Sequence, residues 1–279
     1  MLNENNKRNI QKVWLITGAS RGLGRAFTEM ALSRRDKVCA IARDLSPLHE
    51  LSVRFPNDLL LINADVSDRR QIIDAVKECG ETFGQLDIAI VNAGQFLYGM
   101  IEEVTEIQAR NHFDVNFFGA LWTAQAVAPI MKKQRSGHII QVSSMGSSGG
   151  FASVGLYGAA KAALDSMAEA LSMEVEEFNI KVTILQPGGY ETGLFTQGIT
   201  LTNQLPEYAG LRKRLEEIWA GSYDAPTDKA AKVLNQIVDL PEPPKRIILG
   251  STAFDQVMQI QSARTAEQQK WEALSRQAG

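Results

Sequence analysis

The stretch VWLITGASRGLG, from Val13 to Gly24, decides how this chain folds. A five-residue apolar run is followed by glycines at positions 18, 22 and 24, and a helical pattern begins immediately afterwards. Glycine lets the backbone turn tightly and approach a ligand closely, and the free amides at a helix start favour a pyrophosphate. A glycine turn that merely joins strand to helix is the alternative. Because the motif stands at the first strand of an alternating chain, we favour dinucleotide binding.

The rest of the chain repeats this alternation of strand and helix. The strand-like runs are VWLIT (from Val13), KVCAIA (Lys37), LLLINA (Leu59), LDIAIVNA (Leu86), HIIQVSS (His138), IKVTILQ (Ile180) and RIILG (Arg246), and helical periodicity occupies residues 22–34, 68–83, 105–133, 153–178 and 226–239. Strands that are apolar at every position must be covered on both faces. The sequence therefore predicts a doubly wound α/β fold, a Rossmann fold with a mostly parallel seven-stranded sheet and helices on both faces.

The alternation continues along the chain without a second core, so we predict a single domain over residues 1–279. Two regions depart from the rhythm. Residues 188–225 form a connection far longer than the usual few residues, and such loops tend to be lids over a substrate. Residues 252–279 carry apolar side chains at helical spacing, and this helical tail packs either on the domain or on a neighbouring subunit.

Composition excludes several classes of function. The 29 Lys and Arg nearly balance the 32 Asp and Glu, so nothing points to nucleic acid or to an anionic membrane. The longest apolar segment, which begins at Val115, is broken by polar residues and by Pro129 and is too short to span a bilayer. The polar N-terminal dozen residues lack the pattern of a signal peptide, so we expect a cytoplasmic protein.

The two cysteines, Cys39 and Cys79, fall within a predicted strand and a predicted helix rather than in a disulfide framework. We expect free thiols in a reducing compartment. The three histidines, His49, His112 and His138, are scattered along the chain, and no cluster has the spacing of metal ligands. We therefore predict no metal.

Several motifs occur together in the order typical of one family. They are TGASRGLG, NAG from Asn92 to Gly94, Asn116 within FDVNFFG, VSS at the end of the fifth strand, YGAAK from Tyr157, and PGGYET from Pro187 to Thr192. Over nearly its whole length the chain resembles the classical short-chain dehydrogenase/reductase family. One departure is Ala160, because family members usually carry serine before the lysine; the exchange removes no chemistry that the reaction needs.

The resemblance implies that Tyr157 is the general acid/base, that Lys161 is its partner and a ribose ligand, that Ser144 polarises the carbonyl, and that Asn116 belongs to a proton relay. Ser144 stands thirteen residues before Tyr157, as is usual in the family, so we prefer it to Ser143. Physical chemistry gives a reason for the pair, since a phenol with a pKa near 10 is a poor base at neutral pH. An ammonium ~5 Å away, at an effective dielectric of ~20, favours the phenolate by about 3 kcal/mol, or about two pKa units.

Structural alternatives stand beside these roles. The alternative for Ser144 is a serine at the end of a strand that caps a turn. The alternative for Asn116 is a purely structural buried asparagine whose amide must find hydrogen-bond partners. The resemblance implies that Asn92, with the Ala93 and Gly94 that follow it, both steadies the sheet and lines the cofactor site. Asp65 either contacts adenine, as the resemblance implies, or caps a helix.

The end of the second strand discriminates between the two nicotinamide cofactors. An acid there holds a ribose hydroxyl, whereas a base accommodates a 2′-phosphate. Ala42 occupies the place of the acid, Arg43 follows, and Arg21 adds a second guanidinium, so NADP is favoured; Asp44 keeps NAD possible. The predicted cofactor contacts are Gly18, Ser20, Arg21, Gly22, Leu23, Gly24, Arg43, Asp65, Val66, Asn92, Ala93, Gly94, Tyr157, Lys161, Pro187, Gly188 and Thr192.

The predicted substrate side of the cleft is apolar. Besides Ser144 and Tyr157, its residues are Phe96, Leu97, Tyr98, Met145, Phe151, Tyr190, Leu194 and Phe195. None of these additional residues is charged, so we expect no phosphate or carboxylate on the substrate. The same side chains serve alternatively to pack the lid onto the domain.

The sequence thus predicts an NADP-dependent oxidoreductase that moves hydride between nicotinamide and a ketone or aldehyde or a secondary alcohol of apolar character. One alternative is a non-catalytic NADP-binding regulatory protein, although such a sensor has no need of a proton-transfer group. A sugar-nucleotide epimerase or dehydratase is disfavoured by the glycine spacing, and an NAD-preferring dehydrogenase of the same fold stays open. The resemblance implies a homodimer or homotetramer built on the helices near 105–133 and 153–178.

Overall fold

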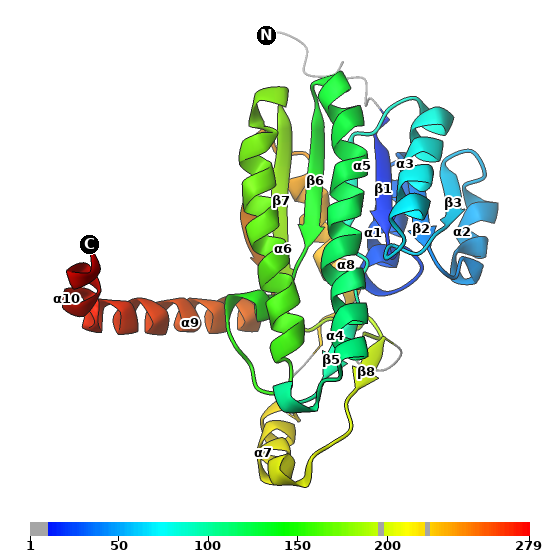
Figure 1. Cartoon of the computed structure of the whole chain (residues 1–279). Helices are drawn as coiled ribbons and strands as arrows, with labels where there is room; N and C mark the ends of the chain where they lie inside the picture. The colour runs from blue at the N-terminus through cyan, green and yellow to red at the C-terminus, as the bar shows by residue number, and fades with distance from the viewer. Residues whose placement is uncertain (1–10, 195–197, 221–223) are drawn as a thin grey trace.

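The computed structural model describes residues 11–194, 198–220 and 224–279. Its main sheet contains seven parallel strands in the order β3-β2-β1-β4-β6-β7-β9 (Figure 1). These strands are β1 (Val13–Thr17), β2 (Lys37–Ala42), β3 (Leu59–Asn63), β4 (Ile88–Val91), β6 (Gly137–Val142), β7 (Ile180–Pro187) and β9 (Arg246–Leu249). The predicted doubly wound fold is confirmed, and the strand order reverses beside β1, where such folds form a crevice for ligands.

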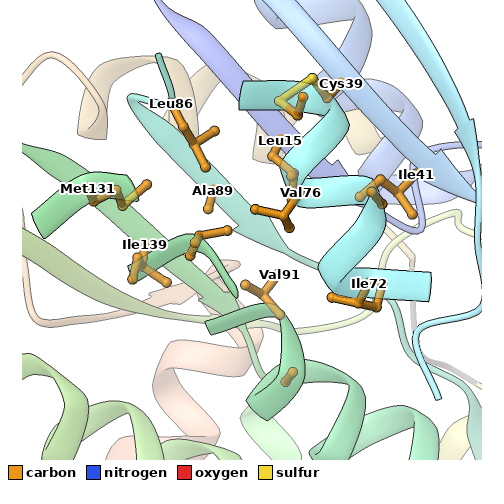
Figure 2. Close-up of a cluster of buried hydrophobic side chains, with 14 of the residues drawn as sticks. Leu15, Cys39, Ile41, Ile72, Val76, Leu86, Ala89, Val91, Met131 and Ile139 are labelled. Atoms are coloured by element: carbon orange, nitrogen blue, oxygen red, sulfur yellow. A yellow bond between two sulfur atoms is a disulfide. The ribbon is translucent and has the colours of Figure 1, made fainter. Parts of the chain in front are cut away.

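Helices cover both faces of this sheet. On one face lie α3 (Arg69–Phe83), α5 (Gly119–Gln134) and α6 (Gly155–Glu174), and on the other lie α1 (Gly22–Ser33), α2 (His49–Arg54) and α8 (Thr227–Ile237). Figure 2 shows the core beneath the first group, where aliphatic side chains of the strands meet those of α3 and α5. Burial on both faces explains why the strands are apolar at successive positions.

Strand β1 illustrates how one short run serves both layers. Successive side chains of a strand point to opposite faces, so Leu15 packs into the core under α3 and α5 while Trp14 and Ile16 pack under α1 and α8. The fully buried indole of Trp14 donates a hydrogen bond of 2.9 Å to the Asp36 carboxylate. The strand is therefore fixed in register by apolar contacts on two sides and by one satisfied polar group.

Several elements escape the sequence prediction. Strand β5 (Phe96–Tyr98) pairs in parallel with β8 (Ile199–Leu201) to form a separate two-stranded sheet, and α7 (Ala209–Trp219) follows β8. The helix expected near 105–133 consists of α4 (Glu106–Phe113), a π-helical turn (Asp114–Phe118) and α5. Figure 1 places β5, β8 and α7 together at one end of the molecule, beyond the carboxyl ends of the main strands.

The C-terminal part of the chain forms α9 (Ser251–Lys270) and the short α10 (Glu272–Ser275). Helix α9 projects away from the body, and Ala253 and Val257 near its start are its buried residues (Figure 1). Most of the tail is therefore exposed in the single chain. None of the described helices is long and apolar enough to cross a membrane.

The expectation of free thiols is wrong. Cys39 on β2 and Cys79 on α3 form a disulfide, with their Cα atoms 5.9 Å apart, inside the core that Figure 2 shows. The sequence placed the two residues correctly on a strand and a helix. Which way each side chain points depends on the packing of α3 on the sheet, and spacing along the chain does not reveal it.

We predict that this disulfide stabilises the fold by about 2–4 kcal/mol. Replacing both residues in a Cys39→Ala, Cys79→Ala variant removes the crosslink together with some buried volume. Urea unfolding of the wild type with and without reductant isolates the contribution of the crosslink, and the midpoint is expected to fall on reduction. Equal midpoints, or alkylation of both thiols in the unreduced denatured chain, would contradict the disulfide.

Candidate active site

A cleft of about 1780 Å³ opens at the carboxyl ends of the parallel strands. The glycine loop, the ends of β2, β4, β6 and β7, and the 188–225 segment all contribute to its walls. Apart from Gly24, all the residues expected to contact a cofactor line this cleft, and so do Ser144 and Asn116. Ligands of doubly wound folds bind at this edge, because the crossover connections leave a crevice there.

The glycine loop is shaped for close approach of a ligand to the backbone. Gly18 and Gly22 have φ values of +65° and +53°, which side chains rarely adopt. A Cβ on Gly24 would overlap the carbonyl oxygen of Gly18, so this glycine brings α1 against the loop instead of touching the cleft. The helix begins after Arg21 without a side-chain cap, which leaves its first amides available to a phosphate group.

Asn92, at the end of β4, ties the glycine loop to the sheet. Its side-chain amide donates to the carbonyl oxygens of Thr17 and Gly18, at 3.0 and 3.3 Å. The Thr17 hydroxyl in turn accepts from the backbone amides of Asn92 and Ala93. The structural role expected for this segment is therefore present, while all three residues of the NAG motif also face the cleft.

Tyr157 and Ser144 face each other in the cleft. Tyr157, on α6, is 8% exposed, and its ring contacts that of Phe96 with centroids 4.9 Å apart. Burial raises the pKa of the Tyr157 phenol, and a hydrogen bond with Ser144 acts in the opposite direction. The net shift is opposite to the one expected from a neighbouring lysine, because loss of solvent disfavours the phenolate. Ser144 also accepts a hydrogen bond from the Gly146 amide, so its turn-capping role is real as well.

Lys161 lies one helical turn after Tyr157, inside the cleft rather than in bulk water. Only 4% of the residue is exposed, and its ammonium donates to the Val142 carbonyl oxygen at 3.0 Å. The Lys161 nitrogen is 5.9 Å from the centre of the Tyr157 ring. Burial lowers the pKa of Lys161 to about 8, which leaves it mainly protonated at neutral pH.

Asn116 sits in the π-helical turn between α4 and α5 and is almost fully buried. Its amide nitrogen donates to the backbone carbonyls of Gln95 and His112, and its oxygen accepts from the Gln95 amide at 3.2 Å. The buried side chain therefore has the partners that its burial requires. Such π-helical turns are frequent at functional sites, and this one holds Asn116 against the loop that follows β4.

Asp165, which the sequence analysis missed, supports the site from below. It lies one turn beyond Lys161 on α6, and its negative charge raises the pKa of Lys161 against the effect of burial. The Asp165 carboxylate accepts hydrogen bonds from Ser147, Gln186 and Arg246, at 2.7, 2.8 and 2.6 Å. The sequence did show that Asp165 follows Lys161 at helical spacing. It did not show the hydrogen-bond partners of Asp165, because these lie in η5 (Met145–Ser148), β7 and β9, which are far apart in sequence.

The residues expected at the adenosine end, Arg21, Arg43 and Asp65, all line the cleft. Arg43 is 67% exposed and forms an ion pair with Asp65 at 3.6 Å, and Arg21 lies beside Gly198. The Asp65 carboxylate accepts from the amide and hydroxyl of Ser67, so it shapes a turn. Helix α3 is capped by Asp68 instead, which removes the capping alternative for Asp65.

The expected substrate residues are mostly at the cleft. Those that line it are Phe96, Tyr98, Met145, Phe151, Tyr190 and Leu194. Leu97 is wrong as a cleft residue, because strand alternation turns it into the interior, where it is 1% exposed. Phe195 lies outside the described residues. The analysis missed Ile199, Leu201, Leu215, Ile218 and Trp219, which complete the apolar wall.

Within the described ranges, no three histidine, cysteine, aspartate or glutamate residues are grouped so that they could hold a metal ion. The cleft brings together hydroxyl groups, the buried ammonium of Lys161 and the glycine loop. The loop matches an extended ligand with phosphate groups.

The sequence matches the family model for short chain dehydrogenases over residues 12–200. The chain belongs to this family.

Two of the following three similar proteins match almost the whole chain, and the third matches about seven tenths of it. Oxidoreductase BOA17 of Botryotinia fuckeliana is 34% identical over 95% of this chain and 98% of its own length. A 3-ketodihydrosphingosine reductase of Bacteroides thetaiotaomicron is 34% identical over 71% of this chain and 72% of its own. The crystal structure of a short-chain dehydrogenase from Streptomyces avermitilis is 33% identical, covers 97% of this chain and 99% of that chain, and has a TM-score of 0.91.

Two more distant crystal structures share the fold and contain different cofactors. One, from Burkholderia phymatum, is in complex with NAD; it is 22% identical, with a TM-score of 0.77 over 89% of this chain and 92% of that chain. The other, from Burkholderia cenocepacia, is in complex with NADP. It is 21% identical and covers 93% of this chain and 97% of that chain, with a TM-score of 0.75. Nicotinamide dinucleotides of both kinds therefore occur on this fold.

His112 gives the site a pH-dependent stability. Burial and the nearby positive charge of Lys161 lower the pKa of His112 to about 4 from its ordinary value of 6.5. The unfolded chain takes up a proton below about pH 6.5 and the folded chain does not, so the free energy of unfolding falls as the pH drops toward 4. His138 has a pKa of about 4 for the same main reason, burial, and contributes likewise.

We predict that the His112→Gln variant loses less stability than the wild type between pH 7 and pH 5. The difference is expected to be about 2 kcal/mol, because about 1.4 kcal/mol is lost per pH unit of displaced titration. Urea unfolding at the two pH values measures it. Identical losses in both proteins would show that His112 titrates normally in the folded state.

Proposed function

We propose that this short-chain dehydrogenase is an NADP-dependent oxidoreductase that transfers hydride between nicotinamide and an apolar ketone, aldehyde or secondary alcohol, with Tyr157 as the general acid/base. One observation carries the proposal: Ser144, Tyr157 and Lys161 line the same cleft as the glycine loop. A proton donor, a hydrogen-bond donor and a cation thus converge where a dinucleotide fits.

The cleft fits the cofactor because its backbone is open where phosphates must approach. Gly18 and Gly22 carry no side chain and have positive φ values that other residues rarely adopt, and Gly94 packs closely against Asn116, where a Cβ would lie 2.9 Å from the side-chain oxygen. We assign the phosphates to the glycine loop and the nicotinamide ribose to Tyr157 and Lys161. When bound, the nicotinamide supplies or accepts the hydride.

The residues of the chain handle the proton. Ser144 donates a hydrogen bond to the substrate oxygen, which gains charge as the carbonyl is reduced. Tyr157 then donates its phenolic proton to that oxygen. Because burial raises the Tyr157 pKa, the phenol is protonated at neutral pH, which is the form that carbonyl reduction requires. The Lys161 ammonium stabilises the phenolate that remains after the transfer.

The preference for NADP rests on two arginines at the adenosine end. Arg21 and Arg43 both line the cleft, and Ala42 offers no carboxylate to hold a 2′-hydroxyl. A guanidinium forms forked hydrogen bonds with a phosphate. The exposed ion pair between Arg43 and Asp65 is weak and is readily exchanged for a doubly charged phosphate.

The apolar wall supports an uncharged small-molecule substrate. One relative is named as a reductase of a keto compound, which favours carbonyl reduction as the reaction class. We further propose that the 188–225 segment acts as a substrate lid, since several of its described residues line the same cleft.

A homodimer or homotetramer built on the long helices stays a prediction. Support comes from exposed apolar side chains on these helices, namely Ile107, Phe118 and Met173. A cytoplasmic location also stays a prediction.

We predict that Tyr157→Phe lowers kcat by about 10²–10⁴-fold, because the variant keeps the ring packing and loses the transferable proton. NADPH binding, followed by fluorescence titration, is expected to change little. The control is Tyr208→Phe, since the Tyr208 hydroxyl bonds Glu102 and does not line the cleft. Retained turnover in Tyr157→Phe would remove this residue from the mechanism.

We predict that Arg43→Ala weakens NADPH binding by at least tenfold and NADH binding by less than threefold, because only NADPH carries the 2′-phosphate. Arg54→Ala is the matched control, as Arg54 lies over the Phe55 ring and not in the cleft. Calorimetric titration with both cofactors measures the effect. Equal weakening of both would contradict phosphate recognition by Arg43.

A further inference from the structure

Three rings that line the cleft lead from the reacting phenol to the surface. The Tyr157 ring contacts that of Phe96, with centroids 4.9 Å apart, and the Tyr98 ring contacts that of Trp219 at 5.8 Å. Phe96 and Tyr98 are two residues apart on β5, so they lie on the same face about 7 Å from each other. The wall from Tyr157 to Trp219 thus extends on the order of 15 Å.

The opposite strand and the helix after it widen this wall. In the two-stranded sheet, Ile199 pairs with Phe96 and Leu201 with Tyr98, so all four side chains face the cleft. On α7, Leu215, Ile218 and Trp219 also line it, at the helical spacing that places them on one face. We call these apolar residues of β5, β8 and α7 the distal wall.

The outer part of the distal wall is exposed, although its side chains are apolar. Ile218 is 70% exposed, Leu201 60% and Trp219 37%. Clustered apolar exposure beside a binding cleft indicates a surface that a ligand covers. The charged residues that line the cleft from the described part of the 188–225 segment are Glu216 and Asp224, whereas Arg21 of the glycine loop lies beside Gly198.

A buried ion pair holds the wall in place before any ligand arrives. Arg212 on α7 pairs with Glu103, and both side chains are buried. The Glu103 carboxylate also accepts from the Thr202 hydroxyl at 2.9 Å and the Leu205 amide at 2.8 Å. The guanidinium of Arg212, together with these hydrogen bonds, lowers the pKa of Glu103 to about 2, so the pair stays charged across the physiological range. The residues before and within α7 are thereby anchored to the loop after β5. Because this segment is already ordered, less conformational entropy is lost when a ligand binds to it.

We propose that the distal wall is a subsite for an elongated apolar group attached to the reacting carbonyl, such as an alkyl chain, and that Trp219 and Ile218 select for its length. This inference rests on the proposed oxidoreductase function. The chemistry near Tyr157 is the same for short and long substrates, whereas each methylene that reaches the wall adds apolar contact. Length selectivity therefore belongs to β5, β8 and α7.

The test compares butanone, hexan-2-one and nonan-2-one as substrates under saturating cofactor. With the wild type, kcat/KM is expected to rise about threefold per added methylene until the chain fills the wall. Trp219→Ala is expected to lower kcat/KM for nonan-2-one by about tenfold, mainly through KM, and to leave butanone within twofold. Ile218→Ser provides a second, exposed variant, and Trp271→Ala, which changes an exposed tryptophan on the tail, is the matched control.

A flat response to chain length, or an equal loss for all three ketones in Trp219→Ala, would overturn the subsite. Absence of turnover with every ketone would count against the proposed reaction instead. In that case calorimetric binding of nonan-2-one decides on the subsite alone: binding that Trp219→Ala weakens tenfold supports it, and binding that the variant leaves unchanged refutes it.

Discussion

A buried ammonium is the constraint on which the site depends. Lys161 lies almost entirely out of water, and a charge in that position persists only when dipoles and counter-charges surround it. The Val142 carbonyl accepts from it directly, and Asp165 lies one helical turn away. Asp165 is in turn held by Ser147, Gln186 and Arg246. Strands β6, β7 and β9 and helix α6 must therefore be in register for the ammonium to remain protonated.

The same constraint explains the state of Tyr157. Burial disfavours both the phenolate and the ammonium, and it raises the pKa of Tyr157 while lowering that of Lys161. The argument from charge alone considered the attraction between the two groups and left out the loss of solvent. With both groups in their protonated forms, the proposed mechanism has Tyr157 donate a proton rather than abstract one, and the Lys161 ammonium would then stabilise the resulting phenolate.

The sequence predicted the elements whose signal is local. Each of the seven main strands is a run of apolar residues, and the glycine loop and the YGAAK segment carry their chemistry within a few positions. What it missed depends on contacts between distant segments: the pairing of β5 with β8, the bond between Cys39 and Cys79, and the Glu103–Arg212 ion pair. Strands of three residues are too short for periodicity to register. The prediction for Leu97 was wrong for a related reason. Phe96 and Tyr98 are apolar like Leu97, but strand alternation turns their side chains toward the cleft and that of Leu97 into the interior.

The two ends of the cleft follow different physical rules. At the end with Lys161, polar groups are buried and held by several partners, although one carboxylate oxygen of Asp165 and the amide oxygen of Gln186 have no hydrogen-bond partner among the described residues. A change to any one of these groups disturbs its neighbours. At the distal wall, apolar side chains on α7 are exposed, and the helix is anchored by the Glu103–Arg212 ion pair, whose arginine lies one turn before Leu215. Because the anchor and the apolar face use different residues, the face can change its side chains without loosening the helix. Under the proposed function, substrate choice is thereby separated from the proton chemistry that we assign to Ser144, Tyr157 and Lys161.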